Sequence, residues 1–257
     1  MPTPSNPIHV ERPMTCSCSA TTAFTARQFD DKRARAELRA YHRRGPGPTT
    51  QRLLSGLRAF GATRGTLLDV GAGIGVLTFE LLKAGMDRAD CVDLSPASIA
   101  IGRAEAARQG WAGKLRWREA DFVTVAPELE PADVVSLDRV VCCYPEYRPL
   151  LEEAARHTRR FLALSYPRDR WFVRAALWVE NAFRRVRGNP FRAFVHSPAA
   201  LDTLLRQSGF NRRFQESTLA WRADIYARSA GRTVDSGFTG AAHSEIRGEA
   251  DLKPAGA

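Results

Sequence analysis

The segment LLDVGAGIGVLTFELL, residues 67–82, decides the fold of this chain. It begins as a short apolar strand, continues through glycines at positions 71, 73 and 75, and ends in a stretch of helical character. Glycine permits a tight turn and lets the backbone approach a ligand, whose polar groups then meet the N–H groups of the helix N-terminus. A dinucleotide-binding loop needs glycine at 71, 73 and 76, but residue 76 is valine. The pattern is G-x-G-x-G behind Asp69, and a plain strand–helix turn is the simpler alternative.

Strand-like and helix-like segments alternate along most of the chain around this loop. Such alternation predicts an α/β fold, with a parallel sheet and helices on both of its faces. Two strands close together near the end predict an antiparallel hairpin. The expected strands cover residues 66–70, 89–94, 115–122, 132–141, 160–167, 211–218 and 220–228, and the expected helices cover 27–44, 49–60 from a Thr cap, 75–85, the segment from Ser95, 171–188 and 197–208.

Acidic residues follow the second and third expected strands. Asp93 ends the second strand about 20 residues past the loop, where a carboxylate can accept hydrogen bonds from both hydroxyls of a ribose. Asp121 and Phe122 close the third strand, where an acid can accept from an adenine amino group and an aromatic ring can cover the base. Open α/β sheets bind ligands at the carboxyl ends of their strands, so we expect these residues to share one site. For Asp93 alone, a solvated acid that caps the next helix is the alternative.

Residues 66–166 resemble a class I S-adenosylmethionine-dependent methyltransferase, because LLDVGAGIG, CVDLS, EADF and VVSLDRVV occur in the family's order and spacing. The resemblance implies S-adenosyl-L-methionine as the cofactor and a Rossmann-like, seven-stranded, mainly parallel sheet whose seventh strand is antiparallel between the fifth and the sixth. It implies that the glycine loop faces the methionine part of the cofactor, Asp93 the ribose, and Asp121 with Phe122 the adenine. The implied cofactor-binding residues are Asp69, Gly71, Ala72, Gly73, Gly75, Asp93, Leu94, Asp121, Phe122 and Asp138.

The same resemblance organises the chain into one domain between two tails. It implies that Asp69 helps to anchor the amino-acid end of the cofactor and that Asp138 lies with Arg139 at the mouth after the fourth strand. Residues at both ends of the chain include few large apolar groups, so we expect them to be mobile. The expected parts are a tail (1–23), a domain (24–228) made of a helical cap (24–60), a cofactor-binding core (66–166), an inserted helix and loop (168–196) and a final helix and hairpin (197–228), and a second tail (229–257).

The tract LDRVVCCYPEYRPLL, residues 137–151, bears on the methyl acceptor. It resembles the corresponding region of magnesium protoporphyrin IX O-methyltransferases, which tend to carry a histidine directly before Tyr-Pro, whereas this chain has Cys143. The candidate catalytic residues are His196 as a proton acceptor, and Tyr144 and Tyr41 as gate residues. The alternatives are loop anchoring or helix capping for His196, and packing for each tyrosine. A carboxylate acceptor is already ionised and needs only to be positioned.

Several other kinds of chemistry are disfavoured by the sequence. We interpret Cys142 and Cys143 as two small apolar residues at a strand end, since the nucleophilic cysteine of RNA cytosine-5 methyltransferases follows a proline and here the proline comes later. Cys16 and Cys18 are too few ligands for zinc, so no metal site is predicted. The odd number of cysteines, the lack of a secretory signal and the lack of any run of about 20 apolar residues predict a cytoplasmic protein without a transmembrane segment.

Nearly all of the formal charge of +10 falls on two segments. Residues 27–44 carry seven basic and three acidic side chains, and residues 168–192 carry seven basic and two acidic ones, so together they hold +9. Both are expected to cap the acceptor side, which predicts a basic mouth for an anionic small-molecule acceptor. In the helix expected at 171–188, apolar residues at 172, 175, 179, 183 and 186 form a stripe that predicts packing on the sheet or over the site. A peripheral membrane contact is the alternative.

These features predict an S-adenosylmethionine-dependent methyltransferase that modifies an oxygen of an anionic or hydrophobic small molecule. A porphyrin carboxylate is the most specific version of that hypothesis. An RNA methyltransferase is one alternative, favoured by the charge but not by the motifs. A non-catalytic cofactor-binding protein of the same fold is another, and the intact glycine and aspartate set argues against it.

Overall fold

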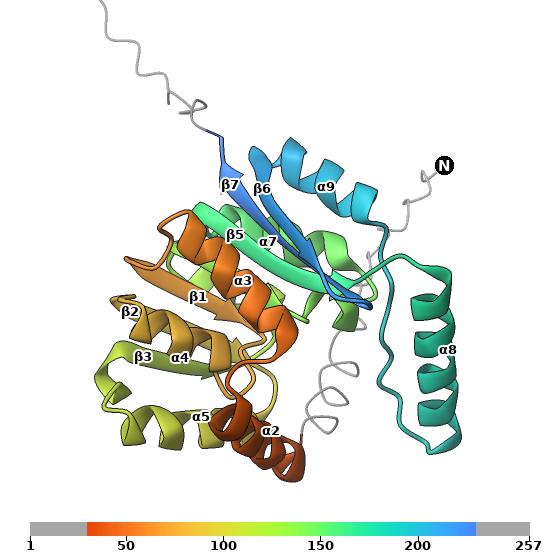
Figure 1. Cartoon of the computed structure of the whole chain (residues 1–257), viewed down its shortest axis with the longest axis horizontal. Coiled ribbons are helices and arrows are strands. Elements are labelled where there is room, and N and C mark those ends of the chain that lie inside the picture. The colour runs from red at the N-terminus through yellow and green to blue at the C-terminus, as the bar shows by residue number, and fades with distance from the viewer. Residues whose placement is uncertain (1–29, 230–257) are drawn as a thin grey trace, which may run out of the picture.

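A seven-stranded sheet forms the centre of the protein (Figure 1). The computed structural model describes residues 30–229, so the tails predicted at 1–23 and 229–257, apart from Ser229, and the cysteines at 16 and 18 lie outside the described residues. The sheet order is β3-β2-β1-β4-β5-β7-β6. The strands are β1 (Thr66–Val70), β2 (Arg88–Asp93), β3 (Leu115–Glu119), β4 (Ala132–Asp138), β5 (Thr158–Pro167), β6 (Phe210–Ser217) and β7 (Trp221–Arg228).

The direction of the strands confirms the predicted topology. The strands from β1 to β5 pair in parallel, whereas β7 runs antiparallel to both β5 and β6. The seventh strand therefore lies between the fifth and the sixth, as the resemblance implied. The carboxyl ends of β1, β2 and β4 meet at one edge, where a site is expected in a sheet of this kind.

Helices cover both faces of the sheet (Figure 1). Apolar residues of α3, α4 and α5 pack into one core, and those of α6, α7 and α9 pack into another core on the opposite face. The α-helices are α2 (Asp31–Arg44), α3 (Pro48–Ala59), α4 (Val76–Lys83), α5 (Pro96–Arg108), α6 (Phe122–Val125), α7 (Tyr147–Arg156), α8 (Trp171–Val186) and α9 (Pro198–Gln207), and the 3-10 helices are η1 (Ala112–Lys114), η2 (Ala126–Glu128) and η3 (Val141–Cys143).

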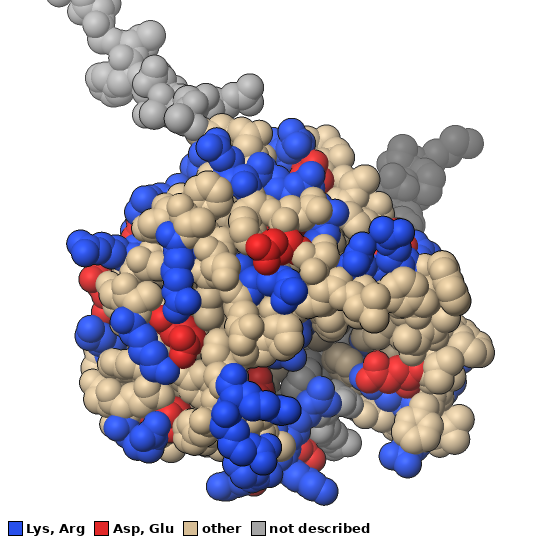
Figure 2. All heavy atoms as spheres, in the orientation of Figure 1, with Lys and Arg blue, Asp and Glu red and all other residues tan. Residues whose placement is uncertain are grey.

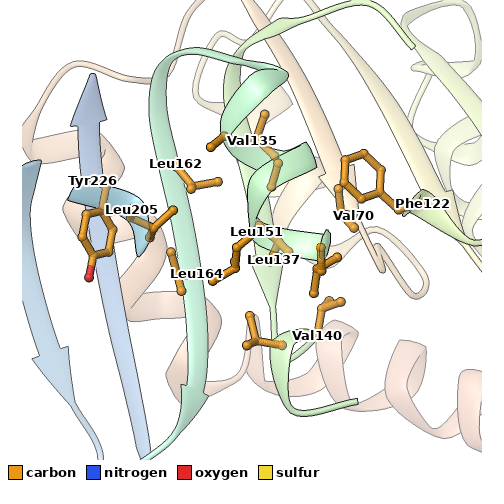
Figure 3. Packing of buried hydrophobic residues seen from close by; sticks show 14 of the residues in the cluster. Val70, Phe122, Val135, Leu137, Val140, Leu151, Leu162, Leu164, Leu205 and Tyr226 are labelled. Atoms are coloured by element: carbon orange, nitrogen blue, oxygen red, sulfur yellow. The ribbon is translucent and has the colours of Figure 1, made fainter. Parts of the chain in front are cut away.

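Alternate residues of the central strands supply the two cores. Leu162 and Leu164 of β5 lie in one core with Leu151 of α7 and Leu205 of α9 (Figure 3). Ala163, between them in the chain, lies in the other core with residues of α3 and α4. Successive side chains of a strand point to opposite faces, so a strand covered on both faces is apolar throughout rather than alternating.

The predicted helix starts are correct in one case and wrong in another. Ser95 caps α5 as predicted, because its Oγ accepts the N–H of Ser98 at 3.0 Å. A threonine was expected to cap α3, but the helix begins one residue earlier, at Pro48, with Gly47 as its cap. Proline fits the first position of a helix because its fixed φ suits the helix and the N–H it lacks has no intrahelical partner there.

Two strands end three residues earlier than predicted, and both endings shape the site. β3 stops at Glu119 instead of 122, because Asp121 caps α6 by accepting the N–H of Val123 at 2.9 Å. β4 stops at Asp138 instead of 141, because Arg139 adopts a φ of 63° that no strand allows. Helix α7 was not among the predicted elements.

Helix α8 lies at the edge of the molecule, away from the sheet (Figure 1). Only Val173 of its 16 residues is buried. The stripe predicted to pack on the sheet or over the site does neither, since Val179 and Phe183 are 58% and 53% exposed. The contact with the returning chain is made by Asn181 instead, whose amide donates to the carbonyl of Ala193 at 2.8 Å and accepts its N–H at 3.0 Å. None of the described helices is long and apolar enough to cross a membrane.

Candidate active site

A cavity of about 500 Å³ opens at the carboxyl ends of β1, β2 and β4. In Figure 2 the surface is hollowed between α2 and α8, and both helices contribute side chains to the lining. We call the side formed by Asp69, Asp93, Leu94 and residues 71–73 the glycine-loop half. The α8 half is formed by Leu177, Glu180, Arg184, Phe191, Ala193 and Trp221. The volume is within the range of sites that bind a small molecule, about 300–1,000 Å³.

The glycine loop needs its glycines for two different reasons. Gly71, Gly73 and Gly75 all have positive φ, at 63°, 57° and 88°. A Cβ at Gly71 would lie 2.4 Å from Cγ2 of Val140, so that position is closed by the protein itself. At Gly73 the nearest atom to such a Cβ is 3.9 Å away, and the position lines the cavity. Gly73 therefore leaves open space next to the backbone, which a ligand can fill.

Asp93 joins the glycine loop to the start of α5. Its Oδ2 accepts the N–H of Gly73 and its Oδ1 accepts the N–H of Ser95, both at 2.7 Å. Burial raises the pKa of Asp93, although these backbone hydrogen bonds act in the opposite direction. Each carboxylate oxygen keeps a further lone pair, and the residue lines the cavity. The structure therefore shows a loop-holding role and leaves the predicted ribose contact sterically available.

Asp69 lies beneath the loop and is almost completely buried. It accepts hydrogen bonds from the hydroxyl of Ser136 at 2.6 Å and from that of Thr78 at 2.7 Å. Burial raises its pKa to about 6, because few polar groups replace the lost water. Its side chain lines the cavity at the end of β1, so a positive group bound there favours the ionised form.

Asp138 and Arg139 form the end of β4. Asp138 accepts hydrogen bonds from the hydroxyls of Thr50 and Ser165, both at 2.5 Å. The N–H of Arg139 donates to the same Ser165 hydroxyl at 2.9 Å, which holds the unusual backbone conformation. The guanidinium approaches Glu37 at 3.5 Å and Asp138 at 4.0 Å, both at or beyond the limit of a hydrogen bond. It lines the cavity and has donors to offer a ligand.

The predicted adenine-binding residues lie close together, but only one of them lines the cavity. Asp121 lies just outside the lining and accepts the hydroxyl of Tyr144 at 3.2 Å. Phe122 lines the cavity while it packs in the core with its edge towards His157. Burial, and then the charge of Asp121, raise the pKa of Tyr144, so this phenol keeps its proton at neutral pH and cannot act as a base.

The remaining predicted residues lie outside the lining. Tyr41 is buried and bonded to Glu80 at 2.8 Å and to Lys83 at 2.7 Å, which agrees with the packing alternative rather than with a gate. His196 donates from Nε2 to the carbonyl of Tyr144 at 2.9 Å, the geometry of a loop anchor. Burial lowers its pKa. Gly75 caps α4 beneath other side chains and does not reach the cavity.

The lining is not the basic mouth that the charge distribution predicted. Arg33, Arg139 and Arg184 line the cavity, but five acids do so as well, namely Asp69, Asp93, Asp138, Glu37 and Glu180. Most of these acids surround the glycine loop, which suits a ligand with positive charge. Burial raises the pKa of Glu37 despite the neighbouring arginines. The arginines of α8 lie mostly on its exposed surface.

Several side chains reach the cavity from outside the sheet and are marked by no motif in the sequence. Glu37 of α2 and Leu177, Glu180 and Arg184 of α8 belong to this group. Arg184 forms an ion pair with Glu180 and donates a hydrogen bond to the side-chain oxygen of Asn181 at 3.2 Å. Its guanidinium lies 5.0 Å from the ring centre of Phe191. Helical periodicity could have grouped the α8 residues on one side, but no pattern shows which side faces the body. In residues 30–229, no group of three His, Cys, Asp or Glu could hold a metal ion.

Comparison with known proteins agrees with this geometry. Residues 67–160 match the family model described as a methyltransferase domain. The chain is 33% identical over 107 residues to the ribosomal protein L11 methyltransferase of Escherichia coli (strain SMS-3-5 / SECEC), which covers 42% of this chain and 36% of that protein. The chain thus spans about a third of the length of the curated relative that it matches.

Solved structures extend the likeness of the fold beyond that core. Magnesium protoporphyrin IX methyltransferase from Synechocystis PCC 6803, with bound SAH, gives a TM-score of 0.64 at 20% identity and covers 82% of this chain and 99% of that one. An O-methyltransferase family protein from Burkholderia thailandensis gives 0.62 at 20% identity, over 82% of this chain and 64% of that one. The sheet order is that of the class I methyltransferase fold, and residues 67–160 within it match a methyltransferase domain.

Proposed function

We propose that this chain binds S-adenosylmethionine in the glycine-loop half of the cavity and methylates an oxygen of an anionic small molecule held towards the α8 half. The observation that carries the proposal is that one cavity joins both halves. The acids lie around the glycine loop, and Arg139 lies at the end of β4. A positively charged methyl donor and a negatively charged acceptor each then meet side chains of opposite charge.

The residues present fit this cofactor. Gly73 leaves space beside the backbone, Asp93 offers its remaining lone pairs to ribose hydroxyls, and Asp69 places negative charge under the loop. We assign Phe122, which lines the cavity, to the adenine end. We also assign Asp121 to that end, because it contacts Tyr144, which lines the cavity. When bound, the cofactor supplies a methyl group on a positively charged sulfur.

For the acceptor, we infer a carboxylate. A carboxylate is ionised at neutral pH and needs orientation more than a base. Arg139 can orient it, because both of its ion contacts are long and a guanidinium suits bidentate contact with a carboxylate. The pKa of Tyr144 is raised by burial and its hydroxyl donates to Asp121, so this phenol does not deprotonate the acceptor. A porphyrin carboxylate is the most specific candidate, supported by the 137–151 tract and by the likeness in fold to a magnesium protoporphyrin IX methyltransferase.

A methyl-transfer screen with labelled cofactor tests this assignment. Porphyrin carboxylates, phenols and RNA are offered separately, and label in a methyl ester supports the carboxylate. The Arg139→Gln variant is then expected to raise the KM for the acceptor about tenfold, since it removes a charge-assisted contact, while cofactor affinity stays the same. The matched control is Arg148→Gln, which removes an exposed arginine of α7. Labelled phenol or RNA with no labelled ester would contradict the proposal.

An RNA acceptor is the second candidate, favoured by the arginines exposed on α2 and α8 (Figure 2). Binding to RNA through such residues depends steeply on salt. Retention on RNA that falls sharply with salt, together with label transfer to RNA, would establish it. If calorimetry detects no S-adenosylmethionine binding, both enzymatic proposals fail and a non-catalytic role replaces them.

A further inference from the structure

Helix α8 presents an apolar face to solvent. Trp171, Trp178 and Val186 are 81%, 72% and 87% exposed, and Val179 and Phe183 are more than half exposed. Trp171 and Trp178 are seven residues apart, and Val179, Phe183 and Val186 are four and three apart, so they form two neighbouring rows on the same side of the helix. Soluble proteins rarely leave this much aromatic and aliphatic surface contiguous and uncovered unless it binds something.

Arginines border that apolar face. Arg174, Arg185 and Arg187 are exposed, and the guanidinium of Arg187 lies 4.1 Å from the ring centre of Phe183. Residues 168–192 carry seven arginines against Asp169 and Glu180, a net charge of +5. Long basic side chains that cover an apolar surface with their stems can hold their charged ends at the level of lipid headgroups.

We propose that the exposed face of α8 docks on a membrane surface that contains anionic lipids, with Trp171, Trp178 and Phe183 inserted among the headgroups. Tryptophan favours the boundary between headgroups and acyl chains, and arginine is attracted to anionic lipids. At 16 residues the helix lies in the surface rather than across it.

A second copy of this chain fits the face less well. A two-fold dimer through α8 brings the same surface of both copies together, so two segments of net charge +5 would face each other. Like charges across an interface oppose association, whereas an anionic lipid surface is complementary to the same arginines. The positive charge of this segment therefore favours an anionic lipid surface over a second copy of the chain.

Docking through α8 also places the cavity beside the membrane, a consequence that rests on the proposed function. Leu177, Glu180 and Arg184 line the cavity from the side of α8 opposite its exposed face. An apolar acceptor with a carboxylate, dissolved in the membrane surface, then reaches the cavity over one helix diameter, about 10 Å. The contact with lipid itself does not depend on which acceptor is used.

Vesicle flotation tests the docking. The protein is mixed with vesicles of phosphatidylcholine alone, or of phosphatidylcholine and phosphatidylglycerol in equal parts, over a range of salt concentrations. We expect binding to the anionic vesicles that weakens as salt rises, and a loss of about tenfold or more in Trp178→Ser/Phe183→Ser, because two exposed aromatic rings no longer insert. Arg185→Gln/Arg187→Gln is expected to weaken binding to anionic vesicles selectively, and Arg213→Gln, an exposed arginine of β6, is the charge control.

Calorimetry with S-adenosylmethionine on the same variants separates the two proposals. Trp178 and Phe183 lie outside the cavity lining, so the double variant is expected to bind the cofactor as tightly as the unchanged protein. Unchanged cofactor binding also shows that the variant is folded. Absence of vesicle binding, equal binding to neutral and anionic vesicles, or unchanged binding by the double variant would overturn the docking. A concentration-dependent dimer that Trp178→Ser/Phe183→Ser abolishes, without vesicle binding, would assign the face to a second copy.

Discussion

The two halves of the cavity are built in opposite ways. In the glycine-loop half, Asp69 and Asp93 are held by hydrogen bonds of 2.6–2.7 Å from neighbouring strands and turns. In the α8 half, Leu177, Glu180 and Arg184 come from a helix that buries only Val173, and the other side chains come from the chain that follows it and from β7. The first half is held by the edge of the sheet, whereas much of the second half depends on a helix at the edge of the fold.

Substitutions of the loop glycines are expected to have the largest effects on the glycine-loop half. Gly71→Ala is expected to lower the free energy of unfolding by about 3 kcal/mol, from left-handed backbone strain and a clash with Val140. Gly73→Ala has similar backbone strain but no clash, so we expect a loss of only about 1 kcal/mol, with cofactor affinity reduced about tenfold. Chemical denaturation and calorimetry measure the two effects. Equal stability of the two variants would contradict the contact described for Gly71.

Asp93 tests whether the loop and the cofactor share one carboxylate. Asp93→Ala is expected to weaken S-adenosylmethionine binding about 100-fold, or about 3 kcal/mol, because the loop anchor and the ribose acceptor are lost together. Asp90→Ala, on the same strand, removes a carboxylate bonded to Arg116 outside this cavity and serves as the control in calorimetry. Unchanged affinity in the Asp93 variant would sink the ribose assignment.

The titration of Asp69 is expected to affect stability and cofactor binding in opposite directions as pH changes. Its pKa of about 6 in the fold is above the ordinary 3.8, so its contribution to stability is present at low pH and is lost as pH rises through 6. A positively charged cofactor favours the ionised form, so affinity is expected to rise up to about tenfold between roughly pH 5 and 7. Calorimetry across that range should show the trend, and Asp69→Asn should flatten it. The same pH dependence in that variant would assign the effect to another acid.

His196 has the smallest expected effect and probes the loop that follows the α8 half. If it anchors the loop through the carbonyl of Tyr144, His196→Ala slows turnover only a few-fold, and cofactor affinity is unchanged. His196→Gln can keep that hydrogen bond and should restore turnover. If His196 instead accepts a proton, both variants stay slow and the rise of activity with pH disappears. Turnover against pH for the two variants decides between anchor and base, and full activity of the alanine variant would leave only a packing role.

The sequence predicted the glycine-loop half because its determinants are local. Glycines at 71 and 73 follow a strand, Asp93 ends the next, and parallel strands bring such ends together without any knowledge of side-chain packing. The errors also have local causes. The Asp121 cap ended β3 early, and the positive φ of Arg139 ended β4, neither of which changes the hydrophobic pattern of the strands.

The roles of residues outside the sheet edge could not be predicted in the same way. Tyr41 and His196 carry suitable chemistry, but tertiary contacts assign Tyr41 to Glu80 and Lys83 and His196 to a backbone carbonyl. Glu37 had no motif to mark it, yet α2 brings it to the cavity.

The sequence by itself determined the order of the strands along the chain, the glycine loop and the acids at the sheet edge. These follow from the period of the hydrophobic residues and from backbone conformations that few residue types allow. Only the tertiary structure decided which side of α8 faces the cavity and which faces solvent. A helix with apolar and basic residues on one side and Leu177, Glu180 and Arg184 on the other satisfies its own hydrogen bonds in either orientation, so its position depends on what the rest of the fold leaves for it to touch.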